Sequence, residues 1–129
     1  MQNSIIYREE SAQIYGAIFE VHKRLGPGLL EKAYQEALSL EFQYRKIPFE
    51  REKQFNIYYR NNKLETCYIA DFICYDKIII ELKAVSAITD VHKAQVVNYL
   101  TIANYKLGIL CNFNDRFIKP IRIINNEIP

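Results

Sequence analysis

The sequence has no tryptophan, one methionine and only three cysteines among its 129 residues. Cys67, Cys74 and Cys111 are odd in number, lie in apolar segments and show no CxxC spacing. This pattern favours buried core thiols over a metal or redox site. Repeats, low-complexity tracts and long linkers are also missing, so we expect a single globular domain spanning residues 1–129.

Two further absences limit where the protein acts and what it binds. No apolar run approaches the length of a membrane span, and the first ten residues lack the basic flank and long apolar stretch of a signal peptide. We therefore expect a cytoplasmic protein without a membrane partner. Its net charge of +2 lacks the strongly basic character of many nucleic-acid-binding domains, so any such binding must come from local patches.

Half of the residues are hydrophobic, and their spacing predicts helices at the start of the chain. Apolar residues recur at helical intervals over residues 9–25, and a break at residues 26–28 follows. A second helix is predicted over residues 29–45, with Leu30, Tyr34, Ala37 and Leu38 buried. Pro48 follows it, as expected after a helix end.

From Phe49 onward the hydrophobic period changes to two, which predicts strands over residues 49–59, 63–75 and 77–85. Thr89 resembles an N-cap and opens a third helix that reaches about Ala103. A buried strand over residues 106–113 follows, and then an edge strand over residues 117–124, because Pro120 cannot donate to a ladder. A strand, a helix and a second strand imply a right-handed crossover with parallel strands. The predicted fold is α/β, in the order ααβββαβ, with a central mixed sheet flanked by helices.

The stretch "IIIELK", residues 78–83, places Glu81 and Lys83 on one face of an otherwise apolar strand. If residues 75–77 form a three-residue hairpin loop, Cys74 pairs with Ile78. Asp71 then lies opposite Glu81, and Ile69 lies opposite Lys83. Directly opposed carboxylates destabilise a sheet unless a cation compensates them.

Mg²⁺ suits such a pair, because it binds one or two carboxylates together with waters and a substrate phosphate. Lys83 beside that ion is suited to orienting an attacking water and neutralising charge on a phosphate. The alternative is a solvated polar face on an edge hairpin, where Lys83 bridges Asp71 and Glu81 and contributes little to stability.

The motifs in this region resemble those of a known superfamily. "ADF" at residues 70–72, followed by "ELK" at residues 81–83, is similar to the D...ExK signature of the PD-(D/E)XK nucleases. Ala70 stands where the superfamily name has proline. "GLLEKAY", residues 28–34, resembles the GxxExxY motif of a small bacterial family, and "QVVNY", residues 95–99, is similar to the QxxxY element of the RecB-type branch.

This resemblance implies a restriction-endonuclease-like core and a magnesium-dependent phosphodiesterase, with Mn²⁺ as a substitute ion. It assigns the metal to Asp71, Glu81 and the backbone carbonyl of Leu82. It also implies that Glu31 completes the metal site or binds a metal-bound water. A helical spacing of seven points Glu31 the same way as the core residue Leu38, so an inward side chain is expected. The alternative is a carboxylate favoured only by the helix dipole.

The third predicted helix carries His92, Gln95, Tyr99 and Ile102 on one face, at spacings of three, four and three. The resemblance implies that Gln95 and Tyr99 reach toward the scissile phosphate or the catalytic acids. His92 is either a phosphate contact near the helix N-terminus or a solvent-exposed histidine in the first turn.

The predicted partner is nucleic acid, with DNA as the expected substrate. No base-reading motif is present, so we expect recognition of the backbone. A chain this small offers little surface for gripping a duplex, and a homodimer or a protein partner would add it. The alternative function is a catalytically silent nuclease-fold subunit that binds or assembles within a larger complex. Candidate phosphate contacts are Lys23, Arg24, Lys32, Arg45, Lys46, Arg51, Lys53, Lys63 and Lys93.

Overall fold

The structure is a computed structural model that describes residues 5–128. It confirms the predicted α/β fold, and the edge strand predicted after the order ααβββαβ is present as a shorter strand, β5. The helices are α1 (Arg8–Leu25), α2 (Glu31–Tyr44) and α3 (Asp90–Ala103). The strands are β1 (Phe49–Tyr59), β2 (Asn62–Cys74), β3 (Ile78–Lys83), β4 (Leu107–Asn112) and β5 (Ile121–Ile124).

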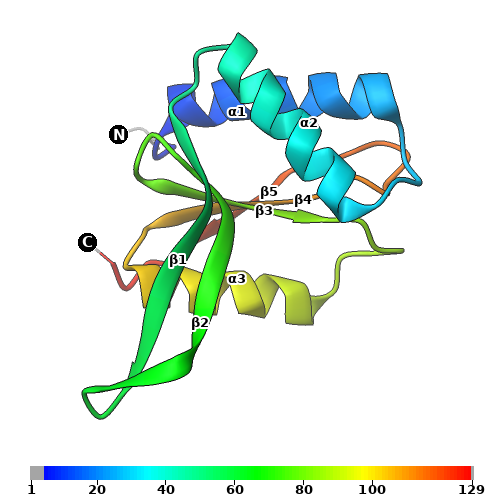
Figure 1. The fold of residues 1–129 in the computed structure, drawn as a ribbon. Helices are drawn as coiled ribbons and strands as arrows, with labels where there is room; N and C mark the ends of the chain where they lie inside the picture. The colour runs from blue at the N-terminus through cyan, green and yellow to red at the C-terminus, as the bar shows by residue number, and fades with distance from the viewer. Residues whose placement is uncertain (1–4, 129) are drawn as a thin grey trace.

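The five strands form one mixed sheet in the order β1-β2-β3-β4-β5. Strands β3 and β4 are parallel and are joined through α3, as the crossover rule predicts, and the other neighbours are antiparallel. Helices α1 and α2 cover one face of the sheet and α3 covers the other (Figure 1). Strand β5 begins directly after Pro120 and forms an edge. No helix among residues 5–128 has both the length and the apolar character that a bilayer span requires.

The core has two parts, one on each face of the sheet, and β3 contributes to both. Ile78, Ile80 and Leu82 pack against α1 and α2, while Ile79 packs on the side of α3. Burying each of these side chains contributes about 1.5–3 kcal/mol. Because β3 is buried on both faces, a polar residue within it is also removed from water. Glu81 is only 7% exposed for this reason.

The turn before α2 differs from the predicted packing. Leu30 was expected in the core, but it is the N-cap of α2 and is 80% exposed. Tyr34 is fully buried, stacks on Phe113, and fastens the turn through its hydroxyl. That hydroxyl donates to the carbonyl of Gly26 and accepts from the N–H of Leu29. Tyr34 is therefore a core residue whose polar end is satisfied.

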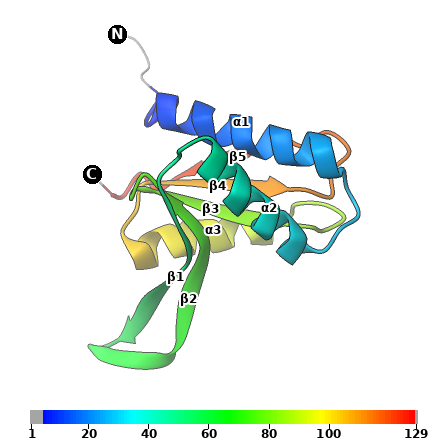
Figure 2. The ribbon, with the colours of Figure 1, turned by 45° about the horizontal axis from the view of Figure 1, so that its top comes forward.

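Strands β1 and β2 continue well beyond the rest of the sheet as a two-stranded arm, residues 54–69 (Figures 1 and 2). The β1–β2 ladder runs out to Tyr59 and Asn62, whereas β3 pairs with β2 only at residues 72–74. The turn lies at Arg60 and Asn61, between the two predicted strands. Both have positive φ, as tight hairpins of the primed type require.

Candidate active site

The predicted acids lie at the point where β2 and β3 separate. Cys74 pairs with Ile78, as the three-residue loop predicts, and pairing continues only to Phe72 and Ile80. Asp71 and Glu81 come one step past the end of this ladder, so they are not an ordinary cross-strand pair. Ile69 does not pair with Lys83 as predicted: Ile69 belongs to the arm and is exposed.

The separation follows from a break in the alternation of β2. Ala70 and Ile73 pack on the side of α3, whereas Phe72 packs on the side of α1 and α2. Two inward residues on one face must be an even number of positions apart in a regular strand, so the strand is irregular at Asp71. In β1, Glu52 occupies the position between the residues paired with Ala70 and Phe72, and its φ is 55°. Both strands thus depart from regular geometry beside the site.

The two carboxylates take over hydrogen bonds that a regular ladder would have made. Asp71 Oδ2 accepts from the backbone N–H of Leu82 at 2.8 Å. Glu81 Oε2 accepts from the backbone N–H of Asp71 at 3.1 Å and from the hydroxyl of Tyr68 at 2.7 Å. Each acid therefore holds the strand of the other, and the two side chains are fixed by the fold itself.

A hydrogen-bonded relay, from Arg51 of β1 through Gln35 of α2, reaches the other oxygen of Asp71. Asp71 Oδ1 accepts from Gln35 Nε2 at 3.2 Å. Gln35 Oε1 in turn accepts from Arg51 Nε and Nη2 at 3.3 and 3.0 Å. The sequence did not identify Gln35, and it indicated Arg51 only as a candidate phosphate contact and not as a partner of this site. The only sequence signal for Gln35 is its position one helical turn after Glu31.

The residues of α3 are placed less directly than predicted. Tyr99 stacks on Tyr68 with ring centroids 3.9 Å apart and so reaches Glu81 through Tyr68, which the sequence reading also missed. Gln95 is exposed and makes no side-chain hydrogen bond within residues 5–128. His92 closes a capping box: its Nδ1 accepts from the N–H of Thr89, and its own N–H donates to the Thr89 hydroxyl. The capping of α3 is by itself enough to explain the position of the His92 side chain.

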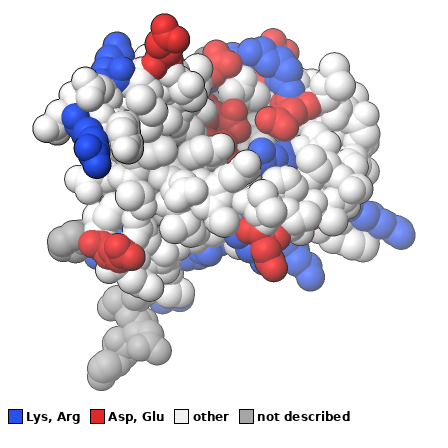
Figure 3. All heavy atoms as spheres, turned by 90° about the horizontal axis from the view of Figure 1, so that it is seen from below, with Lys and Arg blue, Asp and Glu red and all other residues white. Residues whose placement is uncertain are grey.

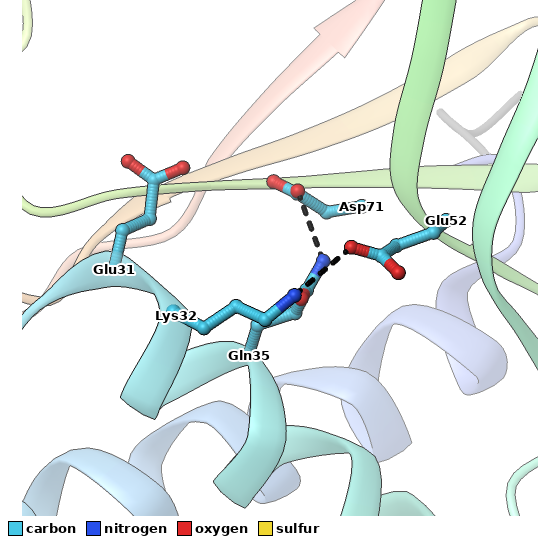
Figure 4. Close-up of a pocket in the computed structure, with 5 residues that line it drawn as sticks. All are labelled: Glu31, Lys32, Gln35, Glu52 and Asp71. Carbon is cyan, nitrogen blue, oxygen red and sulfur yellow. Dashed lines mark hydrogen bonds and ion pairs between the residues drawn. The ribbon is translucent and has the colours of Figure 1, made fainter.

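A cavity of about 240 Å³ opens beside Asp71, between α2 and the start of the arm (Figure 4). Its lining includes Glu31, whose carboxylate faces the same space as that of Asp71. Glu31 is exposed, although its helical spacing from the core residue Leu38 predicted an inward side chain. The first residue of α2 lies past the edge of the core. An ion pair of 3.3 Å between Lys32 and Glu52 crosses the cavity. A larger hollow, about 390 Å³, is lined by Glu9, Glu10, Gln13 and Tyr75 and includes none of the predicted site residues.

Burial makes both acids reluctant to ionise. It raises the pKa of Asp71 to about 6, with repulsion from Glu31 acting in the same direction and the N–H of Leu82 acting against it. Burial and the charge of Asp71 raise the pKa of Glu81 to about 8, although the Tyr68 hydroxyl and Lys83 lower it in part. Lys83, half-buried at the end of β3, favours the ionised form of both acids.

This donor set fits a hard divalent cation. Glu81 is buried and Asp71 is half-buried, and their mutual repulsion is offset by a positive ion. Oxygen is the ligand that Mg²⁺ prefers. Within the described residues, no three His, Cys, Asp or Glu side chains are already arranged as a metal cage. A cation here would therefore have Asp71 and Glu81 as its nearest carboxylates and other oxygen ligands, including water, in its remaining positions, as is usual for Mg²⁺.

The face of the molecule seen from below has no broad basic patch (Figure 3). Acidic and basic side chains gather around a hollow near one edge, and most of the remaining surface in that view is uncharged. This arrangement agrees with the small net charge of +2.

Comparison with known proteins shows the family of this chain. The profile of the PD-(D/E)XK nuclease superfamily matches residues 8–124. The chain belongs to the PD-(D/E)XK nuclease superfamily, whose members generally use divalent metals. A solved structure described as "Crystal structure of SSO0001" is similar with a TM-score of 0.47 and 18% identity, over 96% of this chain and 79% of that one. The search of curated proteins returned no match.

Proposed function

We propose that the protein is a Mg²⁺-dependent phosphodiesterase that hydrolyses nucleic acid, with DNA as the expected substrate. One observation carries the proposal: in this member of a nuclease superfamily, buried Glu81 and half-buried Asp71 lie side by side with raised pKa, and Lys83 is adjacent. Structural ion pairs normally lie at the surface with ordinary pKa values. Two acids that repel each other and destabilise the fold without a cation favour a functional site.

In this proposal Asp71, Glu81 and the backbone carbonyl of Leu82 hold Mg²⁺ or Mn²⁺, and Glu31 supports it from across the cavity. The bound ion supplies Lewis-acid polarisation of the phosphate and a lowered pKa for water. Lys83 orients the attacking water and offsets negative charge that develops on the phosphate. The short bonds from Leu82 and Tyr68 keep both acids in place, so little reorganisation is needed.

The proposal also assigns the protein to the GxxExxY group with a QxxxY element. The residues in support are Gly28, Glu31 and Tyr34, together with Gln95 and Tyr99. Gln95 is exposed, as a substrate contact would be, and Tyr99 acts by holding Tyr68 against Glu81. Contact with a duplex through so small a domain would need a homodimer or a protein partner.

A catalytically silent binding module is the alternative, and no observation favours it. Such a module has no chemical reason to keep Asp71, Glu81 and Lys83 together. The three are retained at the point where the two strands separate.

The test is cleavage of single- and double-stranded DNA and of RNA by Asp71→Asn and Glu81→Gln with Mg²⁺ or Mn²⁺. These variants keep acceptors for the N–H groups of Leu82 and Asp71, whereas alanine would leave both groups unpaired. We expect metal-dependent cleavage by the wild type and none by either variant, with circular dichroism unchanged. Lys83→Met should lower kcat by about 100-fold.

Glu36→Gln is the matched control, because Glu36 lies on α2 near the site but is exposed and points away from it. Its activity should equal that of the wild type. Cleavage retained by both acid variants would remove the proposed site. An effect of Glu36→Gln as large as that of Glu81→Gln would show that the assay reports surface charge.

A further inference from the structure

We propose that Gln35 is a positioning residue that fixes the orientation of the Asp71 carboxylate, and that Arg51 acts on Asp71 only through Gln35. The inference deepens the proposed function, and its importance for metal binding depends on that function. The orientation of Asp71 by Gln35 does not depend on that function, because these hydrogen bonds are present in the metal-free protein.

The direction of the Gln35 amide is determined by its partners. Arg51 has only donors, and two of its nitrogens point at the same oxygen of Gln35. The amide must therefore present Nε2 to Asp71, where it donates to Oδ1. Gln35 is 5% exposed, so water does not compete freely for these bonds. The chain from Arg51 to Asp71 runs in one sense, from donor to acceptor at each link.

This relay completes the restraint on Asp71. The N–H of Leu82 holds Oδ2, and a carboxylate held by one oxygen can still rotate about that bond. Gln35 holds Oδ1 from the opposite element, α2, and thereby fixes the plane of the group. Groups that orient a metal-binding carboxylate in this way typically change metal affinity by about 10–100-fold when removed.

A glutamine that only filled space would not need this arrangement. Gln35 lines the cavity beside Asp71, one turn after Glu31 (Figure 4). A methionine there would keep the volume and the apolar contacts of the side chain while removing both polar links. Gln35→Met therefore separates the positioning role from simple packing.

The first experiment needs no metal. The exchange rate of the Leu82 amide, measured by NMR in metal-free protein, reports how firmly Asp71 Oδ2 is held. We expect Gln35→Met to accelerate this exchange about tenfold relative to the Leu110 amide in β4, since one buried hydrogen bond is lost. Arg51→Met should act in the same direction and less strongly. The double variant should match Gln35→Met alone, because the side-chain hydrogen bonds of Arg51 within residues 5–128 go to Gln35 and none goes to Asp71.

Lys53→Met is the control, because Lys53 is the next cation on β1 and pairs with Glu50 outside the relay. It should leave Leu82 exchange unchanged. Unchanged exchange in Gln35→Met, or an Arg51→Met effect that persists in the Gln35→Met background, would overturn the positioning role. Arg51 is only half-buried, so its variant decides the question even if Gln35→Met folds poorly.

Calorimetric titration with Mn²⁺ then links this role to function. We expect the Kd of Gln35→Met to rise about tenfold, with Lys53→Met unchanged. If the wild type binds no Mn²⁺, the proposed metal-dependent function fails while the exchange data still decide the relay. If the wild type and Gln35→Met bind Mn²⁺ equally, the metal site stands and the positioning role falls.

Discussion

Glu81 accepts two hydrogen bonds inside the core, from Tyr68 and from the backbone of Asp71, yet its charge is opposed by burial and by Asp71. A side chain in this situation is well placed and poorly ionised at the same time. Its folded-state pKa of about 8 lies above the ordinary glutamate value of 4.5. The folded protein therefore holds a proton that the unfolded chain releases.

We predict that the metal-free protein loses stability as pH rises from about 5 to 9. Between its unfolded and folded pKa values, Glu81 binds more protons in the folded state, so the free energy of unfolding falls with pH. Asp71 adds to the loss at the lower end of this range, where its pKa of about 6 lies. Urea denaturation in the presence of a chelator, at pH 5, 7 and 9, measures the effect.

Glu81→Gln should flatten this dependence, because the amide keeps an acceptor and resembles the protonated acid. At pH 9 without metal the variant should exceed the wild type in stability by at least about 1 kcal/mol. The two proteins should converge near pH 5. A variant that is less stable than the wild type at pH 9 would mean that Glu81 is a stabilising ion-pair partner of Lys83.

At the scale of elements, the residues of α3 that stabilise the fold are different from those that are exposed to solvent. Val96 and Leu100 pack into the core, and Thr89 with His92 caps the helix. Gln95 takes part in neither, since it is exposed. Gln95 is therefore an exposed polar residue of α3 without a structural role.

We predict that Gln95→Ala lowers turnover while changing the free energy of unfolding by less than about 0.5 kcal/mol. The amide is assigned to the substrate, so its loss should appear in kcat/KM. Steady-state cleavage and urea denaturation on the same preparation give both quantities. Asn98→Ala, at another exposed position of α3, is the control. Turnover that equals the wild type would remove Gln95 from the site.

Hydrophobic periodicity predicted the helices and strands, and the three-residue loop at residues 75–77 predicted the pairing of Cys74 with Ile78, because both follow from local chemistry. The exposure of Glu31 could not be predicted, since periodicity gives a direction around a helix but not where the core ends. The irregularity at Asp71 was equally hidden, because it depends on β1 and β3 together. Gln35 and Arg51 come to Asp71 from separate elements, and no spacing within one element encodes that meeting.

At the scale of the whole molecule, the metal is expected to act as a stabilising ligand. A site that binds only the folded protein adds about 2.7 kcal/mol when the ion is present at 100 times its Kd. We predict that Mg²⁺ raises the melting temperature of the wild type at pH 8 and raises that of Glu81→Gln much less. The order of stability of the two proteins should therefore reverse on adding the ion.

Differential scanning calorimetry with and without Mg²⁺ measures this reversal. Na⁺ at matched ionic strength is the control, because general screening acts on all charged groups. Equal shifts in both proteins would place the ion away from Glu81.

The arm begins beside Asp71, so a small rotation at the candidate site would displace the far end of the arm. Three residue pairs and three carboxylate bonds join β2 to β3, and Tyr68 packs on Tyr99 of α3, so the hairpin is held near one end and its outer part projects beyond these contacts. The stretch of β2 from Asn62 to Asp71 spans about 30 Å at the usual rise of a strand. A tilt of about 10° at the attachment would carry the far turn through about 5 Å at that length. Sub-ångström shifts of the two acids should therefore produce larger displacements at Arg60 and Asn61. These two residues are where crystal structures with an occupied and an empty site should differ most clearly.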